Sequence, residues 1–590
     1  MPYKKYKDAL PEETVARIKK LYKEKLNLEL HLSVSERLDG VYSATLTDKN
    51  GGWNTCGKGT TASYCAASAY GESVEHLCNY FAYEIANLTS EANKACGFEK
   101  YPDEVLKDLS DIRNDLPDML LDLREAYRLS TGNTASDEHI IDLWKKFLQR
   151  SNIPFVPYYS LKNKCYKYVP ENMIFYLCGS NGGGAGNTPE EAIGHACDEI
   201  MERYVKFNIY MNKLTPPEVP RSYVEKRCPE LACVINELEK NEGYKVIVKD
   251  ASMGKGYSVM SVLMINYKTS EYLVNFGAHP KFEIALERCL TEMFQSFVPQ
   301  QNNRRKKMEK WASVFQRRSS YPQNWVTILK DDSGVVPNEY FKTEPSWDFK
   351  PWPVYEEYSN KLGMNIQLHQ LMSIAPDVYV HDASYLGFPT YRVYVPLVST
   401  SHIPFDEFQL YCFQMMSKFS QKADTLDFTL SDIEEFEKTI FSEQTFVNGL
   451  IFRSLGESRF HLLHSAACYD IKDYNRAKEY AILSRSKYSE AIVRKINLIA
   501  EGYSECDIRE LISLFFDADI ADCLNGWNAQ GAFVTILKIL KNKGVSFSPR
   551  LFMDSSQVKA VNELHIALKN VMAKSELSTN MNTLFENVER

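Results

Sequence analysis

The sequence NGGGAGNTPEEAIGHACDEIMER, residues 181–203, decides the fold of this chain. Thr188 is a residue type that caps helix N-termini, Pro189 suits the first helical position, and Glu191 completes a capping box. A run typical of strands, Ile174–Leu177, comes just before the glycines. The stretch therefore predicts a strand, a glycine turn and a long helix.

The second half of that helix belongs to a pattern that occurs three times. Each copy has a polar residue, a glutamate four positions later, and Glu or Gln three positions after that. On a helix these positions form one stripe, and a glycine-bearing turn lies before each copy. The copies are Ser68–Glu75, His195–Glu202 and Arg288–Gln295, and the turns are Gly57–Thr60, Gly184–Thr188 and Gly277–Pro280.

The residues around the first stripe indicate that it faces an interior cavity. Between Thr60 and Ala82 the only carboxylates are Glu72 and Glu75, whereas a solvent-exposed helix face carries more charges, including lysines. Buried carboxylates are costly unless they are paired or bind a metal ion. Carboxylates from three helices suit Mg²⁺, and arginines on the same helices suit a polyphosphate. The pattern therefore predicts a site for a nucleotide with Mg²⁺.

These residues resemble the motifs of the YcaO family, whose helices read roughly SxxxExxER, NGxxAGNTxxEAxxxAxxExxER and HPxxALxRxLTExxQ. His76 and Gly184 depart from these motifs, which usually have Arg and often have Ser there. Lys7–Ala9 with Thr14 is similar to the start of the long, stand-alone bacterial members, so the resemblance covers most of the chain. The matching positions are Ser68, Glu72, Glu75, Asn181–Gly182, Ala185–Thr188, Glu191–Ala192, Glu199, Glu202–Arg203, His279–Pro280, Ala285–Leu286, Arg288, Leu290–Glu292 and Gln295.

The resemblance implies an α+β fold in two parts. A YcaO-type ATP-binding catalytic domain would occupy residues 1–400, and an all-α, tetratricopeptide-like domain would occupy residues 401–590. The sequence beyond Pro404 agrees, because Leu430–Phe441 and Arg459–Tyr469 have apolar residues at helical spacing. Leu462–Tyr480 resembles one helix–turn–helix unit of a tetratricopeptide repeat.

Carried over residue by residue, the resemblance implies three sets of site residues. The Mg²⁺ ligands would be Glu72, Glu75, Glu199, Glu202 and Glu292. Contacts to ATP would come from Lys7, Thr14, Ser68, Asn187, Glu191, Arg203, Arg288 and Gln295. The catalytic residues would be Glu199, Glu202 and Arg288.

The resemblance also implies an activity. Family members use ATP with Mg²⁺ to phosphorylate a backbone amide oxygen of a peptide or protein, which turns that oxygen into a good leaving group. A Cys, Ser or Thr side chain then attacks to give an azoline, or sulfide attacks to give a thioamide. By layout the chain is similar to members associated with methylthiolation of a small-subunit ribosomal protein as accessory factors.

Two alternatives to the accessory factor stay open. One is an azoline-forming cyclodehydratase or a thioamide-forming enzyme of ribosomally made peptide natural products. The chain ends at Asn587–Arg590 without the proline-rich tail of the azoline-forming enzymes, which makes azoline synthesis the less favoured expectation. The other alternative is a non-catalytic ATP-binding scaffold for a partner protein.

The composition limits the expected cellular location and binding partners of the chain. Its 590 residues are 44% hydrophobic and 25% charged with a net charge of −8, which excludes a mainly disordered chain and argues against direct nucleic-acid binding. The fourteen cysteines form no CxxC pair and no apolar run could span a bilayer, so we expect a cytoplasmic protein without a membrane segment. The expected partners are a peptide or protein substrate, with a ribosomal protein as one candidate, and a protein bound to the C-terminal helices. A homodimer is left open.

Three other patterns are weaker guides. Gly52–Lys58 fits GxxxxGK, but a glycine follows where a P-loop has Ser or Thr. His461 and His464 lack an HExxH companion, which favours a core or surface role over metal binding. The basic run Arg304–Arg318 is typical of a solvated helix face, and otherwise it could contact RNA or an acidic substrate.

Overall fold

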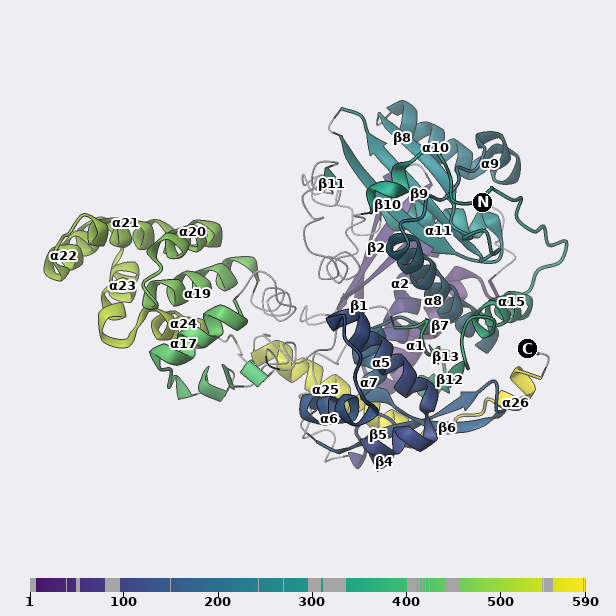
Figure 1. Ribbon diagram of the computed structural model, residues 1–590, viewed down its shortest axis with the longest axis horizontal. Coiled ribbons are helices and arrows are strands. Elements are labelled where there is room, and N and C mark those ends of the chain that lie inside the picture. The colour runs from purple at the N-terminus through teal and green to yellow at the C-terminus, as the bar shows by residue number, and fades with distance from the viewer. Residues whose placement is uncertain are drawn as a thin grey trace. The chain divides into compact units, whose positions relative to one another are not determined.

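The computed structural model describes most of the chain (Figure 1). The described residues are 7–38, 40–48, 54–79, 96–148, 150–241, 243–268, 270–294, 309–310, 336–400, 411, 414–415, 418–419, 421–423, 425–441, 456–543, 545, 555–586 and 588. The chain divides into two compact units. The larger takes in Met1–Tyr83, Ser90–Pro404 and Leu564–Arg590, and the smaller takes in Glu84–Thr89 and Phe405–Glu563.

The described part of the larger unit is built on three antiparallel sheets. Their strand orders are β1–β2–β3, β11–β10–β9–β8 and β4–β5–β12–β13–β7, with β6 also paired to β5. Antiparallel sheets covered by separate helices confirm the α+β class. The strands are β1 (Leu30–Leu38), β2 (Val41–Asp48), β3 (Asn54–Gly59), β4 (Val105–Asp108), β5 (Asn152–Ser160), β6 (Cys165–Pro170), β7 (Gly183–Ala185), β8 (Tyr244–Asp250), β9 (Val259–Asn266), β10 (Glu271–Ala278), β11 (Glu309–Lys310), β12 (Tyr379–Asp382) and β13 (Thr390–Tyr394).

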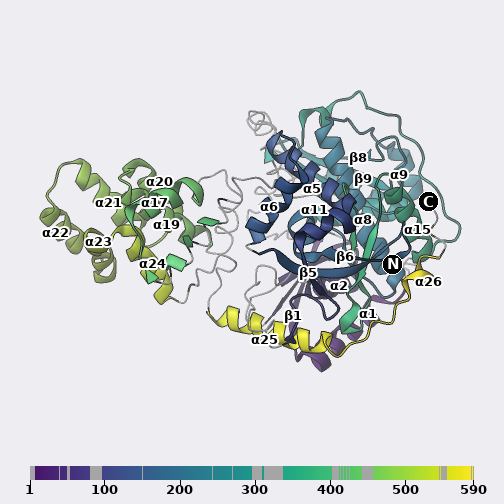
Figure 2. The same cartoon turned by 60° about the horizontal axis from the view of Figure 1, so that its bottom comes forward.

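Helices cover these sheets, and three of them lie close together in both views (Figures 1 and 2). These three are α2, which contacts β3 and β7, α8, which contacts β7 and β10, and α11, which contacts β10 and β3. The helices of the unit are α1 (Pro11–Leu21), α2 (Ala62–Cys78), α4 (Ile112–Asp115), α5 (Pro117–Thr131), α6 (Asp137–Leu148), α7 (Glu171–Cys178), α8 (Pro189–Met211), α9 (Arg221–Arg227), α10 (Pro229–Asn241), α11 (Phe282–Phe294), α15 (Asn360–Met372), α25 (Ser555–Met572) from Leu564 onward, and α26 (Met581–Leu584).

The three sequence repeats form three strand–helix pairs, β3–α2, β7–α8 and β10–α11. In each pair a glycine of the strand lies against the backbone of the helix. A Cβ atom on Gly184 would lie 2.2 Å from Ala192 O of α8, and one on Gly57 would lie 2.3 Å from Cys65 O of α2, so only glycine permits this approach. These glycines lie on strands and not on the predicted turns, and each strand brings the polar stripe of its helix to the same place.

The start of α8 agrees with the sequence in part. The Thr188 side chain caps the helix by accepting a hydrogen bond from Glu191 N at 3.2 Å, as predicted. The Glu191 carboxylate, however, accepts from Lys7 Nζ and Asp8 N instead of closing the predicted capping box. The predicted strand at Ile174–Leu177 is also wrong, because these residues lie in α7. A short apolar run does not distinguish a strand from a buried helix.

The predicted boundary at residues 400/401 lies near the division at Pro404, but the last residues belong to the larger unit. On α25, Lys569 Nζ donates to Phe98 O at 2.5 Å and lies 4.8 Å from the Phe98 ring centroid. Just beyond α26, Phe585 stacks on Tyr159 with 5.8 Å between ring centroids. These contacts join residues far apart in the sequence, so sequence periodicity gives no sign of them.

The smaller unit is helical in all its described elements, which confirms a helical C-terminal region. Helices α19 and α20 form the predicted helix–turn–helix, and the Asp473 side chain caps α20. No described helix of either unit has the length and apolar character needed to cross a membrane. The described helices of the smaller unit are α17 (Leu430–Thr439), α19 (Glu457–Asp470), α20 (Tyr474–Ser484), α21 (Ser489–Ala500), α22 (Glu505–Phe515), α23 (Ala518–Gln530), α24 (Ala532–Asn542) and the start of α25 up to Glu563.

Candidate functional site

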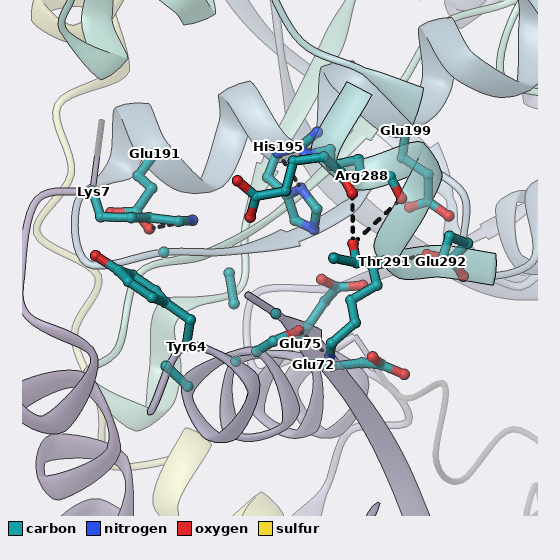
Figure 3. A pocket seen from close by; sticks show the side chains of 18 of the residues that line it. Lys7, Tyr64, Glu72, Glu75, Glu191, His195, Glu199, Arg288, Thr291 and Glu292 are labelled. Carbon is teal, nitrogen blue, oxygen red and sulfur yellow. Dashed lines mark hydrogen bonds and ion pairs between the residues drawn. The ribbon is translucent and has the colours of Figure 1, made fainter. Parts of the chain in front are cut away.

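The stripes of α2, α8 and α11 face one cavity of about 430 Å³, large enough for a nucleotide (Figure 3). Every predicted site residue that the structure describes lines it, and the N-terminal segment contributes two of them. Gln295 lies outside the described residues. The predicted residues along the cavity are Lys7, Thr14, Ser68, Glu72, Glu75, Asn187, Glu191, Glu199, Glu202, Arg203, Arg288 and Glu292.

Carboxylates gather on one side of this cavity. In Figure 3, Glu72, Glu75, Glu199 and Glu292 lie on one side, away from Lys7. They come from three helices, and Glu202 of α8 lines the same cavity. The first stripe therefore faces an interior cavity, as its apolar neighbours predicted.

Burial raises the pKa of these carboxyl groups. It raises the pKa of Glu72 and of Glu202 to about 7, and it raises the pKa of Glu75, which is 7% exposed, well above its usual value. The neighbouring Glu199 carboxylate adds to all three shifts. Several negative charges therefore share a poorly solvated space, where protons or cations must neutralise them.

Basic side chains offset only part of this charge. Arg203 Nη2 lies 2.7 Å from Glu199 Oε1, and Lys58 forms an ion pair with Glu292. The Lys58 pKa is lowered by burial, although Glu202 and other carboxylates oppose that shift. The pKa values of the buried glutamates remain raised with both basic residues in place.

This set of donor atoms fits Mg²⁺. Carboxylate oxygens are ligands that Mg²⁺ prefers, and a divalent ion would neutralise the crowded charge. Among the described residues, no three of these carboxylates bring oxygen atoms within 4.8 Å of one another. They line a wall instead of enclosing one point, which suits ions that also bind phosphate oxygens, since Mg²⁺ usually takes only one or two carboxylates.

The opposite side of the cavity joins the N-terminal segment to the start of α8. Lys7 Nζ lies 3.0 Å from Glu191 Oε1, and Asp8 N donates to Glu191 Oε2 at 3.2 Å. Thr14 Oγ1 donates to Asn187 Oδ1 at 3.0 Å. Burial raises the pKa of Glu191, but Lys7 and the hydrogen bonds outweigh burial, so the pKa lies below its usual value. An ionised Glu191 therefore holds this side together.

Arg288 is held on the cavity wall from three directions. Its Nη1 donates to Asp198 Oδ2 and to Ala278 O, both at 2.7 Å, and its Nη2 lies 3.4 Å from His195 Nδ1. A guanidinium only donates hydrogen bonds, so His195 Nδ1 accepts. His195 lines the cavity, where desolvation, and after it the Arg288 charge, holds the pKa of His195 well below its usual value.

Sequence reasoning missed several residues of the cavity. Lys58 is the most prominent, and its N–H donates to the predicted contact Ser68 at 3.3 Å. The available signal was a lysine between two glycines directly before the first stripe, which the sequence presents only as a failed P-loop match. The other missed residues include Tyr64, Lys206, Asn275, Thr291 and Phe388.

A second cluster of potential metal ligands lies in the smaller unit. Glu437, His464 and Cys468 are buried, with donor atoms within 4.8 Å of one another. A cation is already there, because Arg476 Nη2 lies 2.5 Å from Glu437 Oε1, which also lies 3.2 Å from His464 Nε2. Burial raises the pKa of Glu437, but these two partners outweigh burial and hold it below its usual value. This cluster is an ion-pair network of the core.

Comparison with protein families defines the class of the larger unit. The model for YcaO cyclodehydratase, ATP- and Mg²⁺-binding, matches residues 56–399, more than half of the chain. Residues 56–399 thus form an ATP- and Mg²⁺-binding domain of the YcaO type. The chain belongs to the YcaO family, and ATP and Mg²⁺ are its cofactors.

Two curated relatives are 30% identical to the chain. One is an uncharacterized protein of Haemophilus influenzae, aligned over 408 residues, and the other is the ribosomal protein S12 methylthiotransferase accessory factor YcaO of Escherichia coli, aligned over 412 residues. Each alignment covers 67% of this chain but only 65% of the relative.

Similar solved structures include YcaO from Methanopyrus kandleri bound with AMPPCP and Mg²⁺, with a TM-score of 0.42, and a heterocyclase in complex with substrate and cofactor, with a TM-score of 0.45. Both are 18% identical to this chain and cover 67% of it. The matches span 92% of the M. kandleri chain and 53% of the heterocyclase chain.

Proposed function

We propose that the chain is an enzyme that uses ATP and Mg²⁺ to phosphorylate a backbone amide of a peptide or protein. We also propose that it acts as an accessory factor in methylthiolation of a small-subunit ribosomal protein. The observation that carries the first part is one cavity of a YcaO domain lined by five crowded carboxylates with arginines beside them. The name of the E. coli relative supports the second part.

The proposed roles follow the two sides of the cavity. Bound ATP and Mg²⁺ would supply the phosphoryl group and much of the charge neutralisation. Arg288 would stabilise charge that develops during transfer, and Glu199 and Glu202 would act with it as the catalytic residues. The Mg²⁺ ligands would be Glu72, Glu75, Glu199, Glu202 and Glu292, and the nucleotide contacts would be Lys7, Thr14, Ser68, Asn187, Glu191, Arg203, Arg288 and Gln295.

The helical part after residue 400 is proposed to be tetratricopeptide-like and to bind a partner protein. Consecutive helices α19 and α20, α20 and α21, α22 and α23, and α23 and α24 contact each other, as stacked helix hairpins do. Such stacks present extended binding surfaces. We place the protein in the cytoplasm, because the thirteen cysteines of the described residues are all free thiols.

Intact-mass analysis of candidate substrates separates the proposal from its alternatives. The substrates are a ribosomal small-subunit protein and short peptides, incubated with the chain, ATP and Mg²⁺, with and without sulfide. Loss of one water identifies an azoline-forming enzyme, and exchange of oxygen for sulfur identifies thioamide formation. ATP turnover that depends on the ribosomal protein, with neither product, supports the accessory factor. ATP binding without turnover under every condition supports a non-catalytic scaffold.

A matched pair of variants tests the assigned site. Glu202→Gln keeps the shape of a half-buried cavity residue but removes its charge, and it should reduce ATP turnover at least about 100-fold. Glu283→Gln is the control, because Glu283 belongs to α11 but pairs with Arg227, 3.5 Å away. Equal turnover in Glu202→Gln and the parent would show that the site is assigned wrongly.

A further inference from the structure

We infer that Asp198 is a positioning residue for ATP binding, which acts with Gln367 by fixing the Arg288 guanidinium at the cavity wall. The inference rests on the proposed function, because it takes Arg288 as a contact to the nucleotide. Asp198 falls at an unspecified position of the family motif and was not a predicted site residue. Its role emerges only from contacts between α8, α11 and α15.

Asp198 is buried behind the cavity. Its side chain is 5% exposed, and it does not belong to the lining of the main cavity, although its neighbour Glu199 does. Asp198 Oδ2 accepts from Arg288 Nη1 at 2.7 Å, and Oδ1 accepts from Gln367 Nε2. Both carboxylate oxygens are therefore used, one by α11 and the other by α15.

Gln367 completes the arrangement from the far side. It lies on α15 and its side chain is fully buried, so its amide has little freedom to turn. With Oδ1 held by this amide, the Asp198 carboxylate keeps Oδ2 directed at Arg288. The link joins residues 169 positions apart in the sequence.

The geometry at Arg288 shows what the link achieves. Nη1 is held by both Asp198 and Ala278 O, each at 2.7 Å, which fixes the plane of the guanidinium. Nη2 lies 3.4 Å from His195 Nδ1, and both residues line the cavity (Figure 3). A charge-assisted bond to a carboxylate is stronger and more directional than one to a neutral group. Without it the guanidinium could turn away from a phosphate, and small misplacements of such groups are costly.

The test is a double-mutant cycle on binding, not on turnover. Isothermal titration of the full chain with a non-hydrolysable ATP analogue and Mg²⁺ gives the Kd for the parent, Asp198→Asn, Arg288→Ala and the double variant. Each single variant should weaken binding at least about tenfold. The double variant should bind within about twofold of Arg288→Ala alone, because Asp198 acts through Arg288. A merely structural role of Asp198 would give additive losses.

Two further variants supply a control and an alternative to Asp198→Asn. Asp122→Asn is the control for loss of a buried carboxylate, because Asp122 is 1% exposed and accepts from Tyr394 and Thr400 hydroxyls, not from an arginine. It should bind the analogue like the parent. If Asp198→Asn does not fold, Gln367→Met tests the same link, and it should weaken binding about threefold and only when Arg288 is present.

The outcomes distinguish a failure of the positioning role of Asp198 from a failure of the proposed ATP site. If Arg288→Ala weakens binding but Asp198→Asn and Gln367→Met bind like the parent, or add fully to Arg288→Ala, the positioning role is overturned and the ATP site stands. If Arg288→Ala itself binds like the parent, the proposed contact of Arg288 to the nucleotide is wrong and the inference falls with it.

Discussion

Two clusters of ionisable side chains in this chain differ in how their carboxylate charge is balanced. In the smaller unit, Arg476 and His464 bind Glu437 and hold its pKa below the usual value. In the cavity of the larger unit, burial raises the pKa of Glu72 and Glu202 to about 7 even with Lys58 and Arg203 nearby. The two clusters contain the same carboxylate chemistry and differ in their cations.

The difference separates a structural ion pair from a binding site. A buried carboxylate with its cation in place is a neutral or modest contribution to stability, and removing the cation is costly. A group of crowded carboxylates without enough cations is unfavourable by itself, and protons or a bound ion must neutralise it.

The largest expected effect is on catalysis. Glu199→Gln should lower ATP turnover at least about 100-fold, because the Glu199 carboxylate acts on Glu72, Glu75 and Glu202 from the middle of the crowded group. Glu437→Gln, the same change in the other cluster, should leave turnover within about twofold of the parent. Steady-state phosphate release measures both. Similar losses of ATP turnover in the two variants would show that the two clusters do not differ in function.

The next effect is on stability in the smaller unit. Arg476→Met should lower the free energy of unfolding by about 2 kcal/mol, because it leaves the buried Glu437 carboxylate without its main cation. The value is below the range of about 3–5 kcal/mol for fully buried pairs, since the Arg476 side chain is 39% exposed and solvent screens it. Urea unfolding followed by circular dichroism measures this free energy of unfolding. An unchanged midpoint would mean that Glu437 does not need Arg476.

For a carboxylate of the cavity, we expect the opposite change in the free energy of unfolding. Glu75→Gln should raise the free energy of unfolding of the metal-free protein by about 1 kcal/mol, because it removes one of several crowded buried charges. Urea unfolding in EDTA, compared with the parent, measures it. The same variant should gain less stability than the parent from Mg²⁺ with an ATP analogue. A loss of stability in EDTA would show that Glu75 already has the cation it needs.

The smallest effect concerns a buried carboxylate with neutral partners only. Burial raises the pKa of Asp122 from 3.8 to about 6. Between these values the folded state binds a proton that the unfolded state has released, so stability rises as the pH falls through 6. Asp122→Asn removes this gain. The parent should therefore gain about 1 kcal/mol more than the variant between pH 7.5 and pH 5 in urea unfolding. Equal gains would contradict the raised pKa.

The parts of the site that follow local periodicity could be predicted from the sequence. The stripe with Glu72 and Glu75 is set by helical spacing, and its apolar neighbours already indicated a cavity. Roles that depend on contacts across the fold could not be predicted. Asp198 occupies an undistinguished motif position, and its partner Gln367 is 169 residues away. Lys58 lies on strand β3, and the carboxylates near it in space come from helices α2 and α8. The sequence around Lys58 gives no sign of these neighbours.

The fold shows the same limit. Strands such as Val259–Asn266 follow from their composition, whereas the short apolar run Ile174–Leu177 forms part of a helix. The return of the last residues to the larger unit depends on Lys569 and Phe585, whose partners are hundreds of positions earlier. Periodicity is local information, and these contacts are not local.

The central claim is that the cavity carboxylates hold divalent ions that bind a triphosphate. Its most direct test is a Mn²⁺ titration of the full chain, followed by electron paramagnetic resonance, with and without a non-hydrolysable ATP analogue. We predict that the analogue tightens Mn²⁺ binding in the parent, and that Glu75→Gln weakens the ternary affinity at least about tenfold while Glu437→Gln leaves it unchanged. Mn²⁺ binding that ignores both the analogue and Glu75→Gln would contradict the claim.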